Sequence, residues 1–391
     1  MKPTTRREVL RGGLAVAGLS VLGISDWAIP VLAQGETLVP FLDIPDTFNP
    51  NPSAAIRVLD IRTIDGPFIP ADQFFTTQHY GHPEIDGKAF QLKLSGLVNQ
   101  PKALSLADLR AMRSVELIAG FECSGNSKAR VQGFASNGRW TGVPLRTVLE
   151  QAGVKPEARE FVFFGADHGE ENVEFRTQTF TVDQQFGRSL GREDALSPEP
   201  ILAYALNGAP LTKHQGFPLR LIMPGWYGVA NVKWLSQIHL QAEEYLGKFQ
   251  ARWYRTLHGE TIDGEVKWTE RAVTRMQLKS VVARVTRSGS NGSQHTVLGY
   301  VLNDGTPITS VEVRVDDGPW QPAALDAATM KDKYSWKLFR YTWDDAMPGE
   351  HTLVSRAIDA TGAIQPTVEQ LANKKTFLED NSQFTRRVQI S

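Results

Sequence analysis

The pattern of hydrophobic and polar residues divides the chain into two regions of different character. In the first region, from about residue 39 to 245, strand-like runs such as Phe90–Leu94 and Phe161–Phe164 occur beside a helical run, Leu106–Met112, that follows a serine. A further apolar strand, Pro218–Met223, ends at a Pro-Gly turn. Strands and helices do not alternate regularly, so the pattern predicts a mixed α+β domain and not a doubly wound sheet.

Beyond residue 275 the pattern changes to short β-type runs separated by Gly, Pro and Asp turns. The runs are Met276–Val285, Thr296–Leu302, Ser310–Val315, Lys337–Tyr341 and Thr352–Ala357. Such spacing is typical of an antiparallel sandwich. We therefore predict a first domain over residues 34–258, a polar linker over 259–274 and an all-β domain over 275–391.

Residues 1–33 have the pattern of a twin-arginine signal peptide. Arg6-Arg7 precedes an apolar run, Gly12–Ile24, and Val31-Leu32-Ala33 offers a small-residue cleavage site. The run is shorter than the roughly 20 apolar residues that span a bilayer. We expect export of the folded chain by the twin-arginine machinery, a periplasmic location, a bound cofactor and no membrane span after cleavage. An uncleaved membrane anchor is the alternative.

Charge and cysteine content narrow the classes of function. Lys and Arg number 42 and Asp and Glu number 43, a net charge of -1, which argues against a nucleic-acid-binding protein. Only one cysteine is present, which excludes an internal disulfide, a cysteine-ligated iron–sulfur cluster and a four-cysteine zinc site. Hydrophobic residues make up 41% and charged residues 22%, as in a folded globular protein.

The single cysteine, Cys123, lies where a strand-like run meets a loop. The apolar run Val115–Phe121 leads into it, and Ser124-Gly125-Asn126 follows. Three interpretations are open from the residues alone: a buried structural cysteine, a nucleophile paired with a histidine, and a thiolate ligand of a metal.

Several sequence blocks resemble the sulfite oxidase family of molybdenum-cofactor (molybdopterin) oxidoreductases, in order and spacing over about residues 75–254. These blocks are Cys123–Asn126, Gly138–Leu145, Leu202–Gly208, Gln215–Arg220, Pro224–Gly228 and Val232–Leu235. The later region, including Ser355–Asp359 and Gln365-Pro366, resembles the family's immunoglobulin-like dimerisation domain. The resemblance implies a sulfite-oxidase-type molybdopterin-binding domain followed by an immunoglobulin-like sandwich, and a homodimer.

The resemblance also implies roles for individual residues. Cys123 would be the protein ligand of molybdenum, to which soft sulfur is suited. The residues that would contact the pterin cofactor are Gln78, His79, Asp167, Gln215, Arg220, Asn231 and Lys233. Gln215 stands where the animal enzymes have a histidine, with His214 beside it as a substitute. Each of these residues has an ordinary alternative as a packed or solvated side chain.

The implied substrate pocket departs from the family at two positions. Trp140 and Tyr254 match its aromatic pair, and Tyr254 would gate substrate and protons. Thr77 and Lys128 occupy positions where the family has arginines, and lysine holds an oxoanion only as a point charge. The cations that would restore positive charge are Arg130, Arg255 and the pair Arg386-Arg387.

We therefore expect an enzyme with one molybdenum–molybdopterin per chain and no haem or iron–sulfur cluster. It would oxidise sulfite to sulfate, with Lys128 helping to attract the anion, and pass electrons to an external c-type cytochrome, since no haem-attachment motif is present. Thr77 and Lys128 suggest an alternative: another sulfur compound, or reduction of an S-oxide. An alternative of another class is a secreted, non-enzymatic binding protein in which Cys123 is merely buried.

Overall fold

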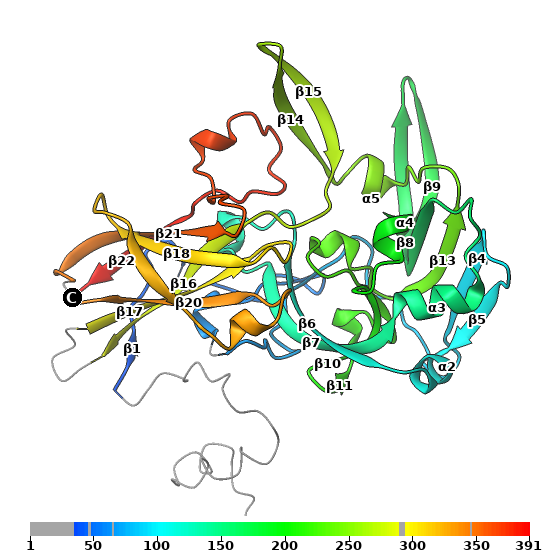
Figure 1. The fold of residues 1–391 in the computed structure, drawn as a ribbon, viewed down its shortest axis with the longest axis horizontal. Coiled ribbons are helices and arrows are strands. Elements are labelled where there is room, and N and C mark those ends of the chain that lie inside the picture. Colours follow the sequence, from blue (N-terminus) through cyan, green and yellow to red (C-terminus); the bar gives the residue numbers. More distant parts are fainter. Residues whose placement is uncertain (1–34, 46–47, 65, 289–293, 345) are drawn as a thin grey trace, which may run out of the picture.

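Two five-stranded sheets and a sandwich account for most of the chain. The structure is a computed structural model, and it describes residues 35–45, 48–64, 66–288, 294–344 and 346–391. The predicted signal peptide, 1–33, lies outside the described residues. Figure 1 shows the first region, in cyan and green, beside the sandwich, in yellow to red. No helix among the described residues has the length and apolar character needed to cross a membrane.

The first region contains two sheets that share one hydrophobic core. One sheet has the order β11-β10-β7-β6, with β12 also paired to β10, and the other has the order β5-β4-β13-β8-β9. The strands of the first sheet are β6 (Val115–Glu122), β7 (Ala135–Pro144), β10 (Ile201–Leu206), β11 (Ala209–Pro210) and β12 (Arg220–Ile222). Those of the second are β4 (Gln91–Gly96), β5 (Lys102–Ser105), β8 (Glu160–Phe175), β9 (Gln178–Gly191) and β13 (Leu235–Gln241). Among the strands that the structure describes, only β4 and β13 pair in parallel, so the α+β prediction is confirmed.

Short helices cover this core. Helix α2 (Leu106–Ala111) begins where predicted, because Ser105 and Asp108 form a reciprocal capping box. Helix α3 (Leu145–Ala152) buries Leu145, Val148, Leu149 and Ala152, one face at helical spacing, and ends at Gly153 with a φ of 72°. Two further single-turn helices are α4 (Arg192–Ala195) and α5 (Lys248–Ala251).

The C-terminal region is the predicted antiparallel sandwich. Its strand order is β1-β16-β17-β20-β19-β18-β21-β22. The bounds are β1 (Thr37–Leu38), β16 (Lys279–Ser288), β17 (Gln294–Leu302), β18 (Ile308–Val315), β19 (Gln321–Leu325), β20 (Lys337–Trp343), β21 (Gly349–Asp359) and β22 (Thr385–Ile390). Strand β19 pairs with both β18 and β20, so it joins the two sheets. Strand β1 pairs with β16, so a segment predicted as part of the first domain adds an edge strand to the sandwich.

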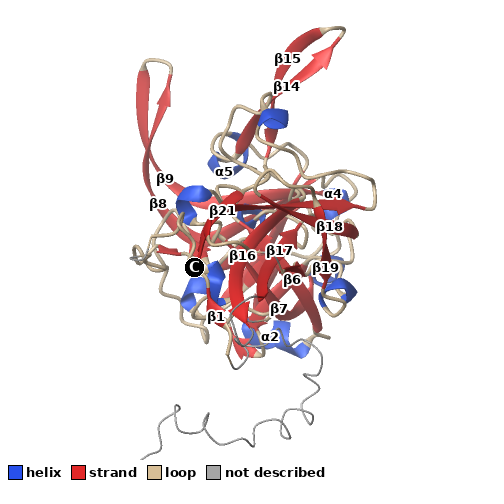
Figure 2. Ribbon diagram, turned by 90° about the vertical axis from the view of Figure 1, so that its left-hand side faces the viewer, coloured by secondary structure: helices blue, strands red, loops and turns tan. Residues whose placement is uncertain are grey.

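The stretch predicted as a linker, residues 259–274, instead lies mostly in a regular hairpin. Strands β14 (Arg255–Ile262) and β15 (Glu265–Ala272) pair over their whole length. Asp263 and Gly264 have φ values of 53° and 80°, as the tight turn of a two-residue hairpin requires. This hairpin and the end of the β8–β9 hairpin project on the same side of the molecule (Figures 1 and 2).

The two domains meet at the loop that follows β6. Lys279 of β16 forms an ion pair with Glu122, at 3.1 Å, and both side chains are only 2% exposed. Asn126 Nδ2 donates to the same Glu122 carboxylate at 2.9 Å. The sandwich also donates from Tyr300 to Gln132 O and from Arg386 to Val131 O. The domains therefore share a polar interface beside Cys123.

We predict that Lys279→Met destabilises the protein by about 3–5 kcal/mol, because Glu122 is left charged and buried without its partner. The double variant Glu122→Gln/Lys279→Met removes both charges and should recover most of that loss. Chemical denaturation of the three proteins measures both effects. An unchanged free energy of unfolding in Lys279→Met would contradict the importance of this pair.

Candidate functional site

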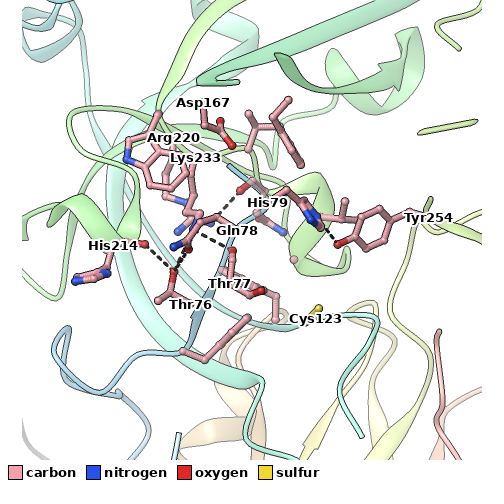
Figure 3. A pocket seen from close by; sticks show the side chains of 18 residues that line it. Thr76, Thr77, Gln78, His79, Cys123, Asp167, His214, Arg220, Lys233 and Tyr254 are labelled. Carbon is pink, nitrogen blue, oxygen red and sulfur yellow. Dashed lines mark hydrogen bonds between the residues drawn. The ribbon is translucent and has the colours of Figure 1, made fainter. Parts of the chain in front are cut away.

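A cavity of about 650 Å³, including the solvent space at its mouth, lies in the first domain next to its boundary with the sandwich. The residues that line it come from β3 (Thr76–Thr77) and the residues on either side of it, from the end of β6 and the Cys123 loop, and from β8 and β9. Others come from the stretch between His214 and Trp234, which includes β12, and from Tyr254 just before β14. Figure 3 shows the side chains around this cavity, with the Cys123 sulfur on one side and a group of polar side chains on another.

Backbone hydrogen bonds position Cys123 directly after β6. Its N–H donates to Phe134 O, and its carbonyl accepts from the N–H of Asn126, both at 2.9 Å. The Asn126 side chain closes the loop, because it donates to Gln132 O and accepts from the N–H of Phe134. Desolvation raises the pKa of the Cys123 thiol to about 11. A metal that binds here would have to displace the thiol proton.

Two buried cations occupy the polar part of the cavity. Arg220 donates to Gln215 O at 3.1 Å and to Asn231 O at 3.0 Å, while its Nε has no partner among the described residues. Lys233 donates to Thr76 Oγ1, Thr77 O and Gln78 Oε1 at 3.0–3.2 Å. Neither forms an ion pair with a carboxylate in the described part of the chain. Burial lowers the pKa of Arg220 to about 9 and that of Lys233 to about 7.

Other polar atoms that line the cavity also lack partners. Asp167 Oδ1 and His214 Nδ1 are buried, and neither forms a hydrogen bond within the described residues. Desolvation raises the pKa of Asp167 to about 6. Native proteins rarely leave buried polar groups unpaired. These atoms therefore fit the hydrogen-bonding groups of a polar ligand, whereas Arg220 and Lys233 fit its negative charge.

His79 and Tyr254 lie together at another side of the cavity. His79 Nε2 is 2.9 Å from the Tyr254 hydroxyl, and the imidazole stacks on Phe249 at 4.6 Å between ring centroids. Desolvation, followed by the positive charges of Lys248 and Lys233, lowers the pKa of His79 to about 4. Burial raises the pKa of Tyr254. At neutral pH the phenol is protonated and the imidazole is neutral, so this contact is a hydrogen bond between two uncharged groups.

The structure brings together most of the residues predicted for the site. The cavity is lined by Gln78, His79, Cys123, Asp167, Arg220, Asn231, Lys233 and Tyr254, as well as by Thr77 and by the substitute His214. The Asn231 side chain is engaged with backbone, since it accepts from Met223 N–H and donates to Tyr227 O. Asn231 contributes to the cavity chiefly by its position beside Arg220.

Three predicted site residues do not line the cavity. Trp140 is 0% exposed, donates to Ala119 O, and lies 4.9 Å from the Arg220 guanidinium, so it supports Arg220 from within the core. The Gln215 side chain donates to Ala71 O, and only its backbone contacts Arg220. Lys128 is exposed in a 3-10 turn, Lys128–Arg130.

The cations proposed to restore positive charge are also absent from the cavity lining. Arg130 packs over Phe134, and Arg255 pairs with Glu270. Arg386 pairs with Asp43, and Arg387 pairs with Glu350.

Sequence reasoning missed several lining residues, namely Phe75, Thr76, Phe121, Phe186, Val229 and Trp234. Each belongs to an apolar strand or to a loop flanking one, where an ordinary core position has the same local pattern. No group of three or more His, Cys, Asp or Glu side chains placed to hold a metal ion occurs within the described ranges.

The chain is similar to known oxidoreductases. Residues 79–249 match the family described as oxidoreductase molybdopterin binding domain. Sulfite oxidase of Arabidopsis thaliana is 28% identical over 344 residues, 79% of this chain and 85% of that protein. Mitochondrial sulfite oxidase of Homo sapiens is 28% identical over 337 residues, 78% of this chain but only 59% of that protein. The chain thus spans most of the plant relative and little more than half of the human one.

A solved structure has the same fold. The sulfane dehydrogenase SoxCD from Paracoccus pantotrophus superposes with a TM-score of 0.72 over 100% of both chains, at 23% sequence identity. This similarity extends the match beyond residues 79–249 to the C-terminal sandwich.

We predict that the ligand-free protein binds sulfate more tightly at pH 6 than at pH 8. Lys233, with a pKa of about 7, gains its charge over this range, whereas sulfate remains a dianion. The affinity should change roughly tenfold, because the protonated fraction of Lys233 changes by about that factor between pH 6 and pH 8. Isothermal titration calorimetry of the wild type and of Lys233→Gln measures it, and Lys233→Gln should lose the part of the pH dependence that is due to Lys233.

The titration of Asp167 also weakens sulfate binding as the pH rises, because its carboxyl gains negative charge above a pKa of about 6. Asp167→Asn is therefore the control, and it should retain the part of the pH dependence that is due to Lys233. Equal sulfate affinities at the two pH values in the wild type would contradict the assignment.

Proposed function

Since the chain belongs to the sulfite oxidase family of molybdenum-cofactor oxidoreductases, we propose that it oxidises sulfite to sulfate in the periplasm. The single observation that carries the proposal is the pairing, in one cavity, of the chain's only thiol with two buried, unneutralised cations. A cofactor with a metal at one end and a phosphate at the other requires such a pairing.

The residues present fit the molybdopterin cofactor. Cys123 Sγ would bind the molybdenum, and Arg220 with Lys233 would bind the phosphate. The unpartnered Asp167 Oδ1 and His214 Nδ1, with the Gln78 amide, would meet the hydrogen-bonding atoms of the pterin. When bound, the cofactor supplies a two-electron oxidation in which oxygen from water is added to sulfur: sulfite and water give sulfate, two protons and two electrons.

The chain's own residues bind the anion and control protons at the mouth. Tyr254 keeps its proton at neutral pH, so it can donate a hydrogen bond to His79 or to a bound oxoanion without ionising. His79 stays neutral above its pKa of about 4, so it accepts that hydrogen bond when the anion is absent. Phe75, Phe121 and Phe186 exclude water from the cavity beside Cys123, which strengthens electrostatic interactions there.

The electrons would pass to an external c-type cytochrome, and the enzyme would act as a homodimer through its sandwich domain. The twin-arginine pattern over residues 1–33 supports export of the loaded protein to the periplasm. The sequence contains no Cys-x-x-Cys-His haem-attachment motif, which supports a separate electron acceptor.

A second candidate substrate is a sulfane or another reduced sulfur compound. Thr77 lines the cavity where the family has an arginine, and Lys128 faces solvent. Both differences weaken the binding of a small dianion. The protein that shares the fold over the whole chain is named a sulfane dehydrogenase. Steady-state assays distinguish these candidates. They measure the oxidation of sulfite, the oxidation of sulfane compounds and the reduction of S-oxides by the same protein.

We predict that Cys123→Ser folds but loses molybdenum-dependent sulfite oxidation, because hydroxyl oxygen replaces the soft thiolate ligand. Sulfite-dependent reduction of cytochrome c, measured together with the molybdenum content of the purified protein, tests this. Ser124→Ala is the matched control: its hydroxyl has no partner among the described residues, so activity should be retained. Full activity of Cys123→Ser would refute the proposed function.

We also predict that Thr77→Arg lowers the KM for sulfite by roughly tenfold, since a guanidinium can hold an oxoanion through two hydrogen bonds. The substitution leaves the hydrogen bond from Lys233 intact, because Lys233 donates to the backbone carbonyl of Thr77 and not to its hydroxyl. Thr77→Met controls for size. A KM that rises equally in both variants would show that position 77 does not face the substrate.

A further inference from the structure

A buried arginine, Arg188, lies behind Tyr254 and has no role in the cofactor contacts described above. It is on β9, and its side chain is 1% exposed. Phe186 lines the cavity two residues earlier, and residues two apart in a strand point to the same face. Arg188 therefore extends from the cavity-facing side of β9.

The guanidinium of Arg188 ties together the two segments that flank Tyr254. It donates to Phe249 O and to Val273 O, each at 2.6 Å. Phe249 belongs to α5, just before Tyr254, and its ring lies 6.5 Å from the Tyr254 ring. Val273 follows β15, and its N–H donates to the Tyr254 carbonyl at 2.9 Å. One side chain thus fixes Tyr254 between α5 and the base of the β14–β15 hairpin.

The charge of Arg188 is not neutralised by direct contact. No carboxylate of the described residues forms an ion pair with it, although the buried Glu379 lies within electrostatic range, and its Nε has no hydrogen-bond partner there. Desolvation lowers its pKa to about 10, so it remains a cation at neutral pH. Its charge opposes the rise in the pKa of Tyr254, which shows that the two groups are within electrostatic range.

The buried Arg386 of the sandwich differs from Arg188 in this respect, whereas Arg220 is likewise without an ion pair within the described residues. Arg386 also donates to two carbonyls, those of Val282 and Val131, but it is paired with Asp43 at 2.8 Å. Burying an unpaired cation is costly. The charge of Glu379 offsets part of this cost for Arg188, and an anion bound in the cavity would offset more of it.

We propose that Arg188 is a positioning residue of the site: it holds Tyr254 at the mouth and supplies the fixed positive charge that favours an anionic substrate there. This inference rests on the proposed oxidation of a sulfur compound at the same cavity. In this proposal Arg188, behind Tyr254, supplies the positive charge that the neutral Thr77 and the solvent-facing Lys128 do not bring to the cavity.

The test compares Arg188→Met, which removes the charge, with Arg188→Lys, which keeps the charge but cannot bridge the two carbonyls in the same way. Steady-state kinetics of the holoenzymes are measured with sulfite and with a neutral dialkyl sulfite. Arg188→Met should raise the KM for sulfite by roughly tenfold or more and the KM for the neutral ester by less than about threefold, while kcat falls with both substrates because Tyr254 is held less firmly. Arg188→Lys should keep the wild-type KM for sulfite within about threefold, with a lower kcat because Tyr254 is held less firmly.

Arg192→Lys is the matched control for an arginine that also donates to two backbone carbonyls, those of Lys155 and Ala158, but does not line the cavity, and its KM for sulfite should equal that of the wild type. An equal rise in KM with both substrates in Arg188→Met, or the same KM in Arg188→Met and Arg188→Lys, would overturn the inference. If the wild type oxidises neither substrate, the proposed function fails on its own. Binding of sulfate to the wild type and to Arg188→Met then decides the role of Arg188, because weaker binding to the variant supports it and equal binding refutes it.

Discussion

The ion pair between Glu122 and Lys279 links the position of the only thiol to the packing of the two domains. Glu122 is the last residue of β6 and Cys123 follows it directly, while Lys279 is the first residue of β16 in the sandwich. Asn126 binds the same carboxylate and also bonds to Gln132 and Phe134, so the loop closes around Cys123. None of the described residues of the sandwich lines the cavity. The sandwich nevertheless holds the Cys123 loop in place through this ion pair.

Positive charge is distributed unevenly around that site. The chain as a whole has a net charge of -1, and some of its exposed cations are paired with carboxylates, as Arg255 is with Glu270. The buried cations Arg220, Lys233 and Arg188 instead bond to carbonyl, hydroxyl and amide oxygens. Neutral acceptors satisfy the geometry of a cation but leave its charge available to an anion. Two of these cations lie where the phosphate of the cofactor would bind, and the third lies behind Tyr254.

Local sequence patterns were sufficient to predict the fold class, the sandwich strands and helix α2, because a capping box and an alternation of apolar residues are local properties. The β14–β15 hairpin was mistaken for a linker, although Asp263-Gly264 between β-type residues signals a tight turn. The family resemblance pointed to Cys123, Arg220, Lys233 and Tyr254, and the structure brings these four residues to one cavity. It misplaced the side chains of Trp140, Gln215 and Lys128, because a motif fixes a position in the chain but not the direction of a side chain. Arg188 carries no local signal, since its role comes from two carbonyls 61 and 85 residues away.

The central claim is that Cys123 is the protein ligand of a molybdenum cofactor in this cavity, and X-ray absorption at the molybdenum edge measures it most directly. In the purified holoenzyme we expect a sulfur shell of about three atoms, two from the pterin dithiolene and one from Cys123. In a Cys123→Ser protein that still contains molybdenum, the shell should fall to about two sulfur atoms. The same number of sulfur ligands in both proteins, or purified wild-type protein without molybdenum, would contradict the claim.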